Sequence, residues 1–143
     1  LMSWKSNLSY NITMADHIIF GEINLSPLIK VKSQLDDALA NIKDDLDRTG
    51  AIKLFEMCYE LSWKTLKKVI EAQGLIVKAN PREVYRIAAD QELIDDPETW
   101  FNFHETRNLT VHTYNEETAK SIFDKLGEFQ ELLDQLTNKL KSL

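Results

Sequence analysis

The side chains best suited to chemistry in this sequence lie close together, between Arg107 and Tyr114. A histidine such as His112 can take a proton near neutral pH, and an arginine such as Arg107 carries a permanent positive charge. Such a pair could remove the proton of a ribose 2′-hydroxyl and stabilise the charge that grows on the neighbouring phosphate. These residue types are therefore sufficient for metal-independent cleavage of RNA.

The spacing of Arg107 and His112 sets a condition on that chemistry. The two residues are five positions apart, which on a straight α-helix places them roughly 140° apart around the axis. They converge only if the helix unwinds near His112. We predict a break at residues 113–115, with Tyr114 in the same opening. The simpler interpretation is that Arg107 pairs with a nearby acid such as Glu105 and that His112 caps helix carbonyls.

Two further polar residues could support this group. His104 lies three positions before Arg107 and four before Asn108, so these side chains could share one helix face. No cysteine accompanies the histidines, and they show no tight spacing with carboxylates. We therefore expect neither a metal site nor a bound cofactor.

An Asp-x-Asp triplet, Asp45-Leu46-Asp47, is the one pattern that suggests metal-dependent nucleotidyl transfer. Such enzymes need carboxylates that hold metal and a backbone turn that approaches the phosphates. The triplet has no preceding strand and no Gly-rich turn. We interpret it as part of the solvated face of the first helix, and the chain as not itself a nucleotidyltransferase.

The net charge of −6 argues against a general nucleic-acid binder, because nonspecific affinity comes from cations that displace phosphate counterions. Contact with RNA would have to be local. Two small basic groups could provide it, although isolated patches of this kind usually serve solubility. They are Lys64, Lys67 and Lys68 in one group and Arg82 and Arg86 in the other.

The elements that must position these residues are all helices. Apolar residues recur at spacings of three and four, and Ser26-Pro27, Asn80-Pro81 and Asp96-Pro97 are typical helix starts. The expected helices cover residues 26–47, 51–72, 80–89, 96–112 and about 119–140. Gly74 suits the left-handed end of the second helix. The fold class is all-α: an antiparallel, up-down four-helix bundle with a short inserted helix.

Length and composition fit one soluble domain. The chain has 143 residues, 43% hydrophobic and 28% charged, which suffices for a single core. We assign residues 1–24 to an irregular N-terminal extension, with Met14 as a candidate natural start, and residues 25–143 to the bundle. The sole cysteine, Cys58, sits in an apolar setting and cannot form an internal disulfide. No apolar run suits a membrane or a secretion signal, so we expect a cytoplasmic protein.

Three segments in this order resemble one protein family. They are FEMCYELSWK at residues 55–64, PRE at 81–83 and RNLTVHTY at 107–114. The sequence resembles the nucleotidyltransferase substrate-binding proteins of the HEPN superfamily, close to the HepT toxins. The similarity extends from about Leu25 to Leu136. The Arg-Asn-x-x-x-His-x-Tyr pattern is fairly specific when it accompanies the other two segments.

The resemblance implies a helical homodimer with the motif helices of both subunits along a shared cleft. It also implies a partner, a separate minimal nucleotidyltransferase of the MntA-like type, usually encoded nearby. In one role known for the family, Arg107 and His112 would cleave RNA, and the transferase would silence the toxin by attaching a nucleotide to Tyr114. In another, the bundle only binds substrate for the transferase. A purely structural dimerisation bundle is the third alternative.

Overall fold

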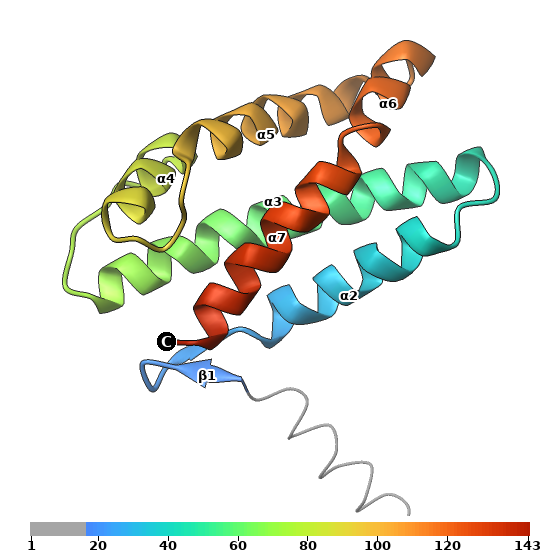
Figure 1. Ribbon diagram of the computed structural model, residues 1–143. Helices are drawn as coiled ribbons and strands as arrows, with labels where there is room; N and C mark the ends of the chain where they lie inside the picture. The colour runs from blue at the N-terminus through green and yellow to red at the C-terminus, as the bar shows by residue number, and fades with distance from the viewer. Residues whose placement is uncertain (1–16) are drawn as a thin grey trace, which may run out of the picture.

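The computed structural model describes residues 17–143, which form a helical fold preceded by a small β-hairpin (Figure 1). The candidate start Met14 and most of the expected extension lie outside the described residues. The elements, in chain order, are β1 (Ile18–Ile19), β2 (Ile23–Asn24), α2 (Ser26–Ala40), α3 (Asp45–Ala72), α4 (Pro81–Asp90), α5 (Pro97–Leu109), the 3₁₀-helix η1 (Thr110–His112), α6 (Glu116–Phe123) and α7 (Leu126–Lys141). The predicted helical class is confirmed. No helix among these residues is long and apolar enough to cross a membrane.

The hairpin differs from the irregular extension expected up to residue 24. Its two strands pair antiparallel, with Ile19 opposite Ile23, and both side chains are buried. The turn between them contains Phe20 and Gly21 at positive φ. Residues 18–24, which were expected to be irregular, therefore form a hairpin that contributes Ile19 and Ile23 to the hydrophobic core.

The break between the first two helices lies earlier in the chain than predicted. The helix expected over residues 26–47 ends at Ala40, and α3 already begins at Asp45. The reason is local: the Asp44 carboxylate accepts the amide of Asp47 at 2.9 Å, and the Asp47 carboxylate accepts the amide of Lys43 at 2.8 Å. This reciprocal capping satisfies free amides and starts a new helix. Leu46, expected on the apolar stripe of the first helix, is instead 78% exposed in the first turn of α3.

The start of the first helix also differs in detail from the expected Ser26 N-cap. The cap position is Leu25, and Ser26 is the first helical residue. The Asn24 side chain accepts the Ser26 amide at 3.0 Å, while the Ser26 hydroxyl accepts the His17 amide at 3.2 Å. The serine therefore ties the hairpin to α2.

Helix α3 is the central element, and in Figure 1 it runs behind α7 and alongside both α2 and α5. It ends as predicted at Ala72, and Gly74 follows with a φ of +87° that suits a glycine. The connection from Gly74 to α4 is irregular and exposes 96% of Ile76. This connection lies at the opposite end of the molecule from α6 (Figure 1).

The predicted starts of α4 and α5 are confirmed. The Asn80 side chain accepts the amides of Arg82 and Glu83, and the Asp96 side chain accepts the amide of Glu98 at 2.9 Å. In each case proline follows directly, where its missing N–H costs no hydrogen bond. These caps fix where α5 begins, and so where its far end presents Arg107.

The last helix is divided, contrary to the single long helix expected. Its apolar spacing continues through Ile122, Phe123 and Leu126, but the backbone turns at residues 124–125. The Lys125 amide bonds to the Ile122 carbonyl at 3.0 Å, one residue short of the α-helical partner. Figure 1 shows α6 and α7 running in different directions from this turn.

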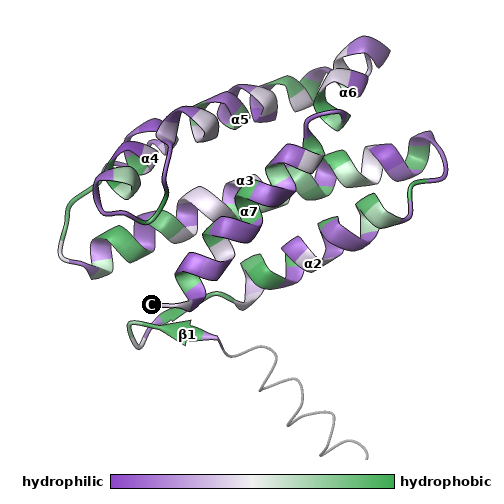
Figure 2. Cartoon of the chain, viewed as in Figure 1, coloured by the Kyte–Doolittle hydropathy of each residue, from purple (hydrophilic) through white to green (hydrophobic). Residues whose placement is uncertain are grey.

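An aromatic cluster holds α5 against the rest of the core. Phe129 of α7 makes edge-on contacts with Phe55 of α3 and Phe103 of α5, at centroid distances of 4.8 and 5.2 Å. Trp100 stacks on Tyr85 of α4 at 5.1 Å. Figure 2 shows that the side of α7 turned to the viewer is mostly hydrophilic, so its apolar residues face inward onto this cluster. The base of α5 is thereby a rigid support for the motif at its end.

Candidate functional site

The motif lies where α5 gives way to the 3₁₀-helix η1. Thr110 is buried, and its hydroxyl donates to the Arg107 carbonyl at 2.7 Å. The Thr110 amide also bonds to the Arg107 carbonyl, and this 3₁₀-type backbone bond tightens the last turn. The irregular interval at residues 113–115 is confirmed, and the change from α-helix begins three residues earlier than expected.

Arg107 is held against α3. Its Nε lies 3.4 Å from Oε1 of Glu60, and its Nη1 donates to the Thr110 hydroxyl at 3.2 Å. The side chain is 27% exposed, and Nε is shielded from solvent. The acid expected beside Arg107 was Glu105, but Glu105 pairs with Arg82 at 2.7 Å. Arg107 therefore has an acidic partner, as expected, but that partner is Glu60 of α3 rather than a residue of its own helix.

His112 and Tyr114 form a second pair, turned to solvent. Nδ1 of His112 lies 3.1 Å from the Tyr114 hydroxyl oxygen, and the two rings meet edge-on at 5.7 Å. Tyr114 is 82% exposed. The Asn115 side chain accepts the amides of Glu117 and Thr118 and so caps α6 directly after the pair. His112 bonds to a tyrosine rather than capping carbonyls.

The structure thus brings the predicted residues together in two groups. Among residues 17–143, no hydrogen bond or ion pair joins Arg107 to His112 or Tyr114. Asn108 is exposed. Arg107 is therefore held by Glu60 and Thr110, whereas His112 is held by Tyr114.

His104, like Arg107, lies against α3. Its Nδ1 lies 2.7 Å from the Tyr59 hydroxyl, so His104 and Arg107 contact neighbouring residues of α3. Burial raises the pKa of the Tyr59 hydroxyl well above its usual value. Tyr59 therefore stays neutral and serves as a fixed hydrogen-bonding partner. The expected shared face is confirmed for His104 and Arg107.

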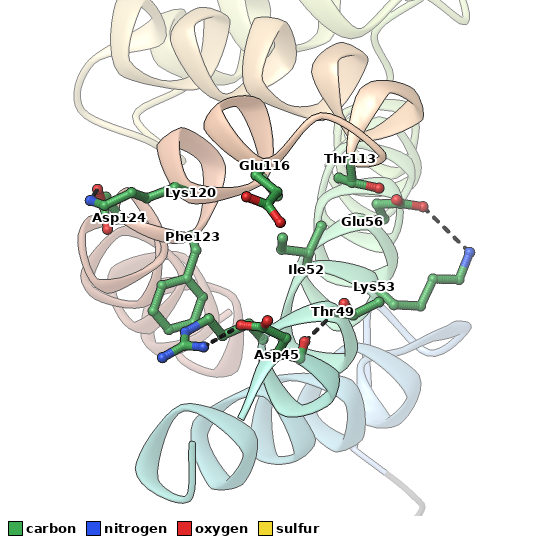
Figure 3. Close-up of a pocket in the computed structure, with 12 residues that line it drawn as sticks. Asp45, Thr49, Ile52, Lys53, Glu56, Thr113, Glu116, Lys120, Phe123 and Asp124 are labelled. Atoms are coloured by element: carbon green, nitrogen blue, oxygen red, sulfur yellow. Dashed lines mark hydrogen bonds and ion pairs between the residues drawn. The ribbon is translucent and has the colours of Figure 1, made fainter. Parts of the chain in front are cut away.

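A cleft of about 780 Å³ opens beside the motif, between the first half of α3 and α6 (Figure 3). Thr113, which joins His112 to Tyr114, forms part of its wall, and Phe123 lines the opposite end. The Arg48 guanidinium lies 5.9 Å from the centre of the Phe123 ring. Nothing in the sequence indicated this cleft, because it depends on the turn between α6 and α7.

The charges in the cleft are mostly balanced within it. Three cations pair with neighbouring acids: Arg48 with Asp45, Lys53 with Glu56 and Lys120 with Asp124. Glu116 points into the cleft (Figure 3) and makes no ion pair within the described part of the chain. The wall therefore carries a small excess of negative charge.

The family follows from sequence. The profile of the family described as nucleotidyltransferase substrate binding protein like matches residues 23–142. The chain belongs to this family.

Known relatives agree with the assignment. A Haemophilus influenzae protein named probable ribonuclease HepT is 31% identical over 111 residues, which span 72% of this chain and 76% of the relative. A crystal structure from Thermus thermophilus is 32% identical with a TM-score of 0.72, covering 79% of this chain and 98% of that one. A structure from Haemophilus influenzae, described as revealing the fold of a substrate-binding domain of a nucleotidyltransferase, is 28% identical with a TM-score of 0.76. The match covers 82% of this chain and 99% of that one.

The basic groups and the Asp-x-Asp triplet that the sequence offered as candidates take part in ion pairs and helix capping. The basic groups are partly neutralised, since Lys67 pairs with Glu71 at 3.1 Å and Arg82 with Glu105. Asp45 and Asp47 take part in the start of α3. No group of three or more potential metal ligands occurs within residues 17–143.

Sequence reasoning missed two residues of the site, Glu60 and Thr110. Both lie in segments that resemble the family, but neither was identified as a contact of Arg107. Thr110 could have been found from its position three residues after Arg107, where its hydroxyl can reach the Arg107 carbonyl. Glu60 gave no comparable local signal, because its contact depends on how α5 packs on α3.

Proposed function

We propose that this protein is the helical partner subunit of a minimal nucleotidyltransferase and acts as a metal-independent ribonuclease that nucleotidylation of Tyr114 silences. The similarity to a protein named probable ribonuclease HepT supports the proposal. The observation that carries it is the exposed pair of His112 and Tyr114, whose Nδ1 and hydroxyl oxygen are 3.1 Å apart.

In the proposed reaction, His112 removes the proton of a ribose 2′-hydroxyl as that oxygen attacks the adjacent phosphorus. The bond from this phosphorus to the 5′-oxygen of the next nucleotide breaks, the 5′-oxygen leaves with the electron pair and takes a proton from water, and a 2′,3′-cyclic phosphate and a 5′-hydroxyl result. Arg107 stabilises the negative charge that grows on the phosphate oxygens. Its guanidinium is already oriented by Glu60 and Thr110, so little rotational freedom is lost when the phosphate binds. No metal ion takes part.

We further propose that the active form is a homodimer with a shared cleft. No hydrogen bond joins Arg107 to His112 within residues 17–143, and in a homodimer the second motif segment would add another arginine and histidine to the shared cleft. Leu109 and Val111 are exposed apolar residues of the motif segment, with 40% and 67% of their surface accessible. A second copy would bury them.

Nucleotidylation would act directly on the histidine. A nucleotide joined to the Tyr114 hydroxyl places a phosphodiester within a few ångströms of His112. The attached group occupies the space an RNA phosphate needs and adds negative charge that repels it. Cleavage would stop without any change of fold.

The test combines RNA cleavage with intact mass. The purified chain is incubated with total RNA, alone and after treatment with the neighbouring transferase and ATP. We expect cleavage by the untreated chain, its loss as Tyr114 gains nucleotide mass, and no cleavage by the His112→Ala or Arg107→Ala variants. His17→Ala, which alters a histidine in the hairpin region, should cleave normally. Undiminished cleavage by His112→Ala would refute the catalytic role.

The second candidate is a non-catalytic substrate-binding subunit of the transferase. The description of the Haemophilus influenzae structure favours it, as do the net charge of −6 and the ion pair of Arg107 with Glu60. This role predicts no RNA cleavage but an altered rate of nucleotide transfer by the partner. If neither activity responds to changes in the motif, the purely structural dimerisation role is left.

A further inference from the structure

We propose that His112 is also the general base for the modification of Tyr114, so that one imidazole serves both RNA cleavage and its silencing. The inference rests on the proposed function, because it concerns nucleotide transfer to this tyrosine. It assigns a catalytic group for that transfer to the modified protein itself, in addition to whatever the transferase supplies.

Tyr114 is the only described tyrosine that a transferase can reach. Tyr59 and Tyr85 are buried in the core, with about 1% and 0% of their surface accessible, whereas Tyr114 is 82% exposed. Burial also raises the pKa of both core hydroxyls, which disfavours the phenolate form that attacks phosphorus. Among residues 17–143, modification at tyrosine therefore falls on Tyr114.

The attacking hydroxyl already has a base in contact with it. A phenol keeps its proton at neutral pH, so a base must take that proton as the new bond forms. In the tautomer that carries its hydrogen on Nε2, Nδ1 of His112 accepts the Tyr114 hydroxyl across 3.1 Å. No other hydrogen bond to the Tyr114 hydroxyl occurs in the described part of the chain.

The backbone holds this pair in place from both sides. The Asn115 amide bonds to the His112 carbonyl at 3.1 Å, closing a turn around the two intervening residues. Before the pair, Thr110 fixes the end of α5 through its bond to the Arg107 carbonyl. The hydroxyl and its base are therefore positioned before any nucleotide arrives.

The chemical step is balanced as follows. The Tyr114 hydroxyl oxygen attacks the α-phosphorus of a nucleoside triphosphate held by the transferase, and a tyrosine–phosphorus ester bond forms. The bond from the α-phosphorus to the oxygen that bridges to the β-phosphate breaks, and pyrophosphate leaves with that electron pair. The phenolic proton passes to Nδ1 of His112. The resulting imidazolium lies beside the new phosphodiester, where opposite charges attract.

Two substitutions of the histidine separate proton transfer from simple positioning. His112→Ala removes both functions. His112→Gln keeps an oxygen that can accept the Tyr114 hydroxyl but cannot take its proton at neutral pH. The measurement is the rate at which purified full-length chain gains nucleotide mass with transferase and ATP, over a range of pH. His17→Gln is the matched control, and circular dichroism confirms that each variant is folded.

We expect both variants to be modified about 100-fold more slowly, the lower part of the usual range for a general base. The wild-type rate should rise with pH to a plateau, the His112→Gln rate should lose that inflection, and added imidazole should partly restore His112→Ala. Wild-type rates in both variants, or in His112→Gln alone, would overturn the inference and leave the proposed function intact. A wild-type chain that gains no mass would overturn both.

Discussion

At the scale of single residues, the main feature is the arginine that two neighbours hold in place. Glu60 contacts Nε of Arg107 from α3, while Thr110 accepts from Nη1 on the motif itself. Glu60 also accepts the Trp63 indole N–H at 3.2 Å, so its carboxylate is fixed from its own helix. The guanidinium is thus oriented by groups that never touch the proposed substrate.

This arrangement predicts that Glu60→Ala lowers RNA cleavage although Glu60 is not a catalytic residue. Without its partner the guanidinium gains freedom, and misplacement of a catalytic group by about 1 Å can cost about 100-fold in rate. We expect most of the loss in kcat rather than KM, measured on a short RNA. Glu71→Ala removes an acid of α3 that also pairs with a cation, Lys67, and should cleave normally. An unchanged kcat in Glu60→Ala would contradict the positioning role.

Residue types were more predictable than residue contacts. The chemistry of Arg107, His112 and Tyr114 follows from their side chains, and the break after His112 was expected from the sequence. The contact of Arg107 with Glu60 rather than Glu105 was not predictable, because it joins two helices far apart in the chain. Closeness in sequence therefore did not identify the acid that contacts Arg107 across the interface of α5 and α3.

At the scale of elements, local signals located the helix starts better than apolar spacing located the breaks. Asn80 and Asp96 cap the helices that they were expected to cap, because a cap is a bond within a few residues. The break between the first two helices was predicted at residues 48–50 but lies at 41–44, and the break at 124–125 was missed, since the apolar spacing continues through both actual breaks. The capping acids of α3 and the turn at Lys125 override that spacing.

The caps allow a matched test of the motif's surroundings. Asn115 and Asn80 each accept two backbone amides at the start of a short helix, so Asn115→Ala and Asn80→Ala should each lower the free energy of unfolding by about 1 kcal/mol. Only Asn115 adjoins His112 and Tyr114. We expect Asn115→Ala alone to slow modification of Tyr114, with stability followed by urea denaturation and modification by intact mass. Equal modification rates in the two variants would show that this cap does not shape the motif.

At the scale of the whole molecule, the core encloses the one thiol of the chain. Cys58 is fully buried in α3, and burial raises the pKa of its thiol to about 12. Because the thiolate is the reactive form, the folded protein should resist thiol reagents even in mildly alkaline solution. The whole fold must open before this side chain can react.

We predict that labelling of Cys58 by a thiol reagent follows global unfolding. At pH 8 the native protein should label very slowly, and raising the pH to 9 should accelerate native labelling at least as much as labelling of the unfolded chain in urea, because the native protein reacts only through its unfolded thiol. The sign follows from the raised pKa: the folded state keeps its proton where the unfolded state begins to lose it, so alkaline solution also lowers stability. Labelling rates with and without urea test this. Rapid native labelling would mean that α3 opens locally.

The irregular connection after Gly74 has a practical consequence for following this protein in cells. Its Ile76 side chain is almost fully exposed, and the connection lies at the opposite end of the molecule from α6, the helix that follows the His112–Tyr114 pair in the chain. Exposed connections of this kind tolerate inserted sequence, whereas the ends of a chain can be needed elsewhere. A fluorescent domain placed between Leu75 and Ile76 would therefore leave α3, the motif and both termini unaltered. The protein and its modified form could then be tracked by one and the same reporter.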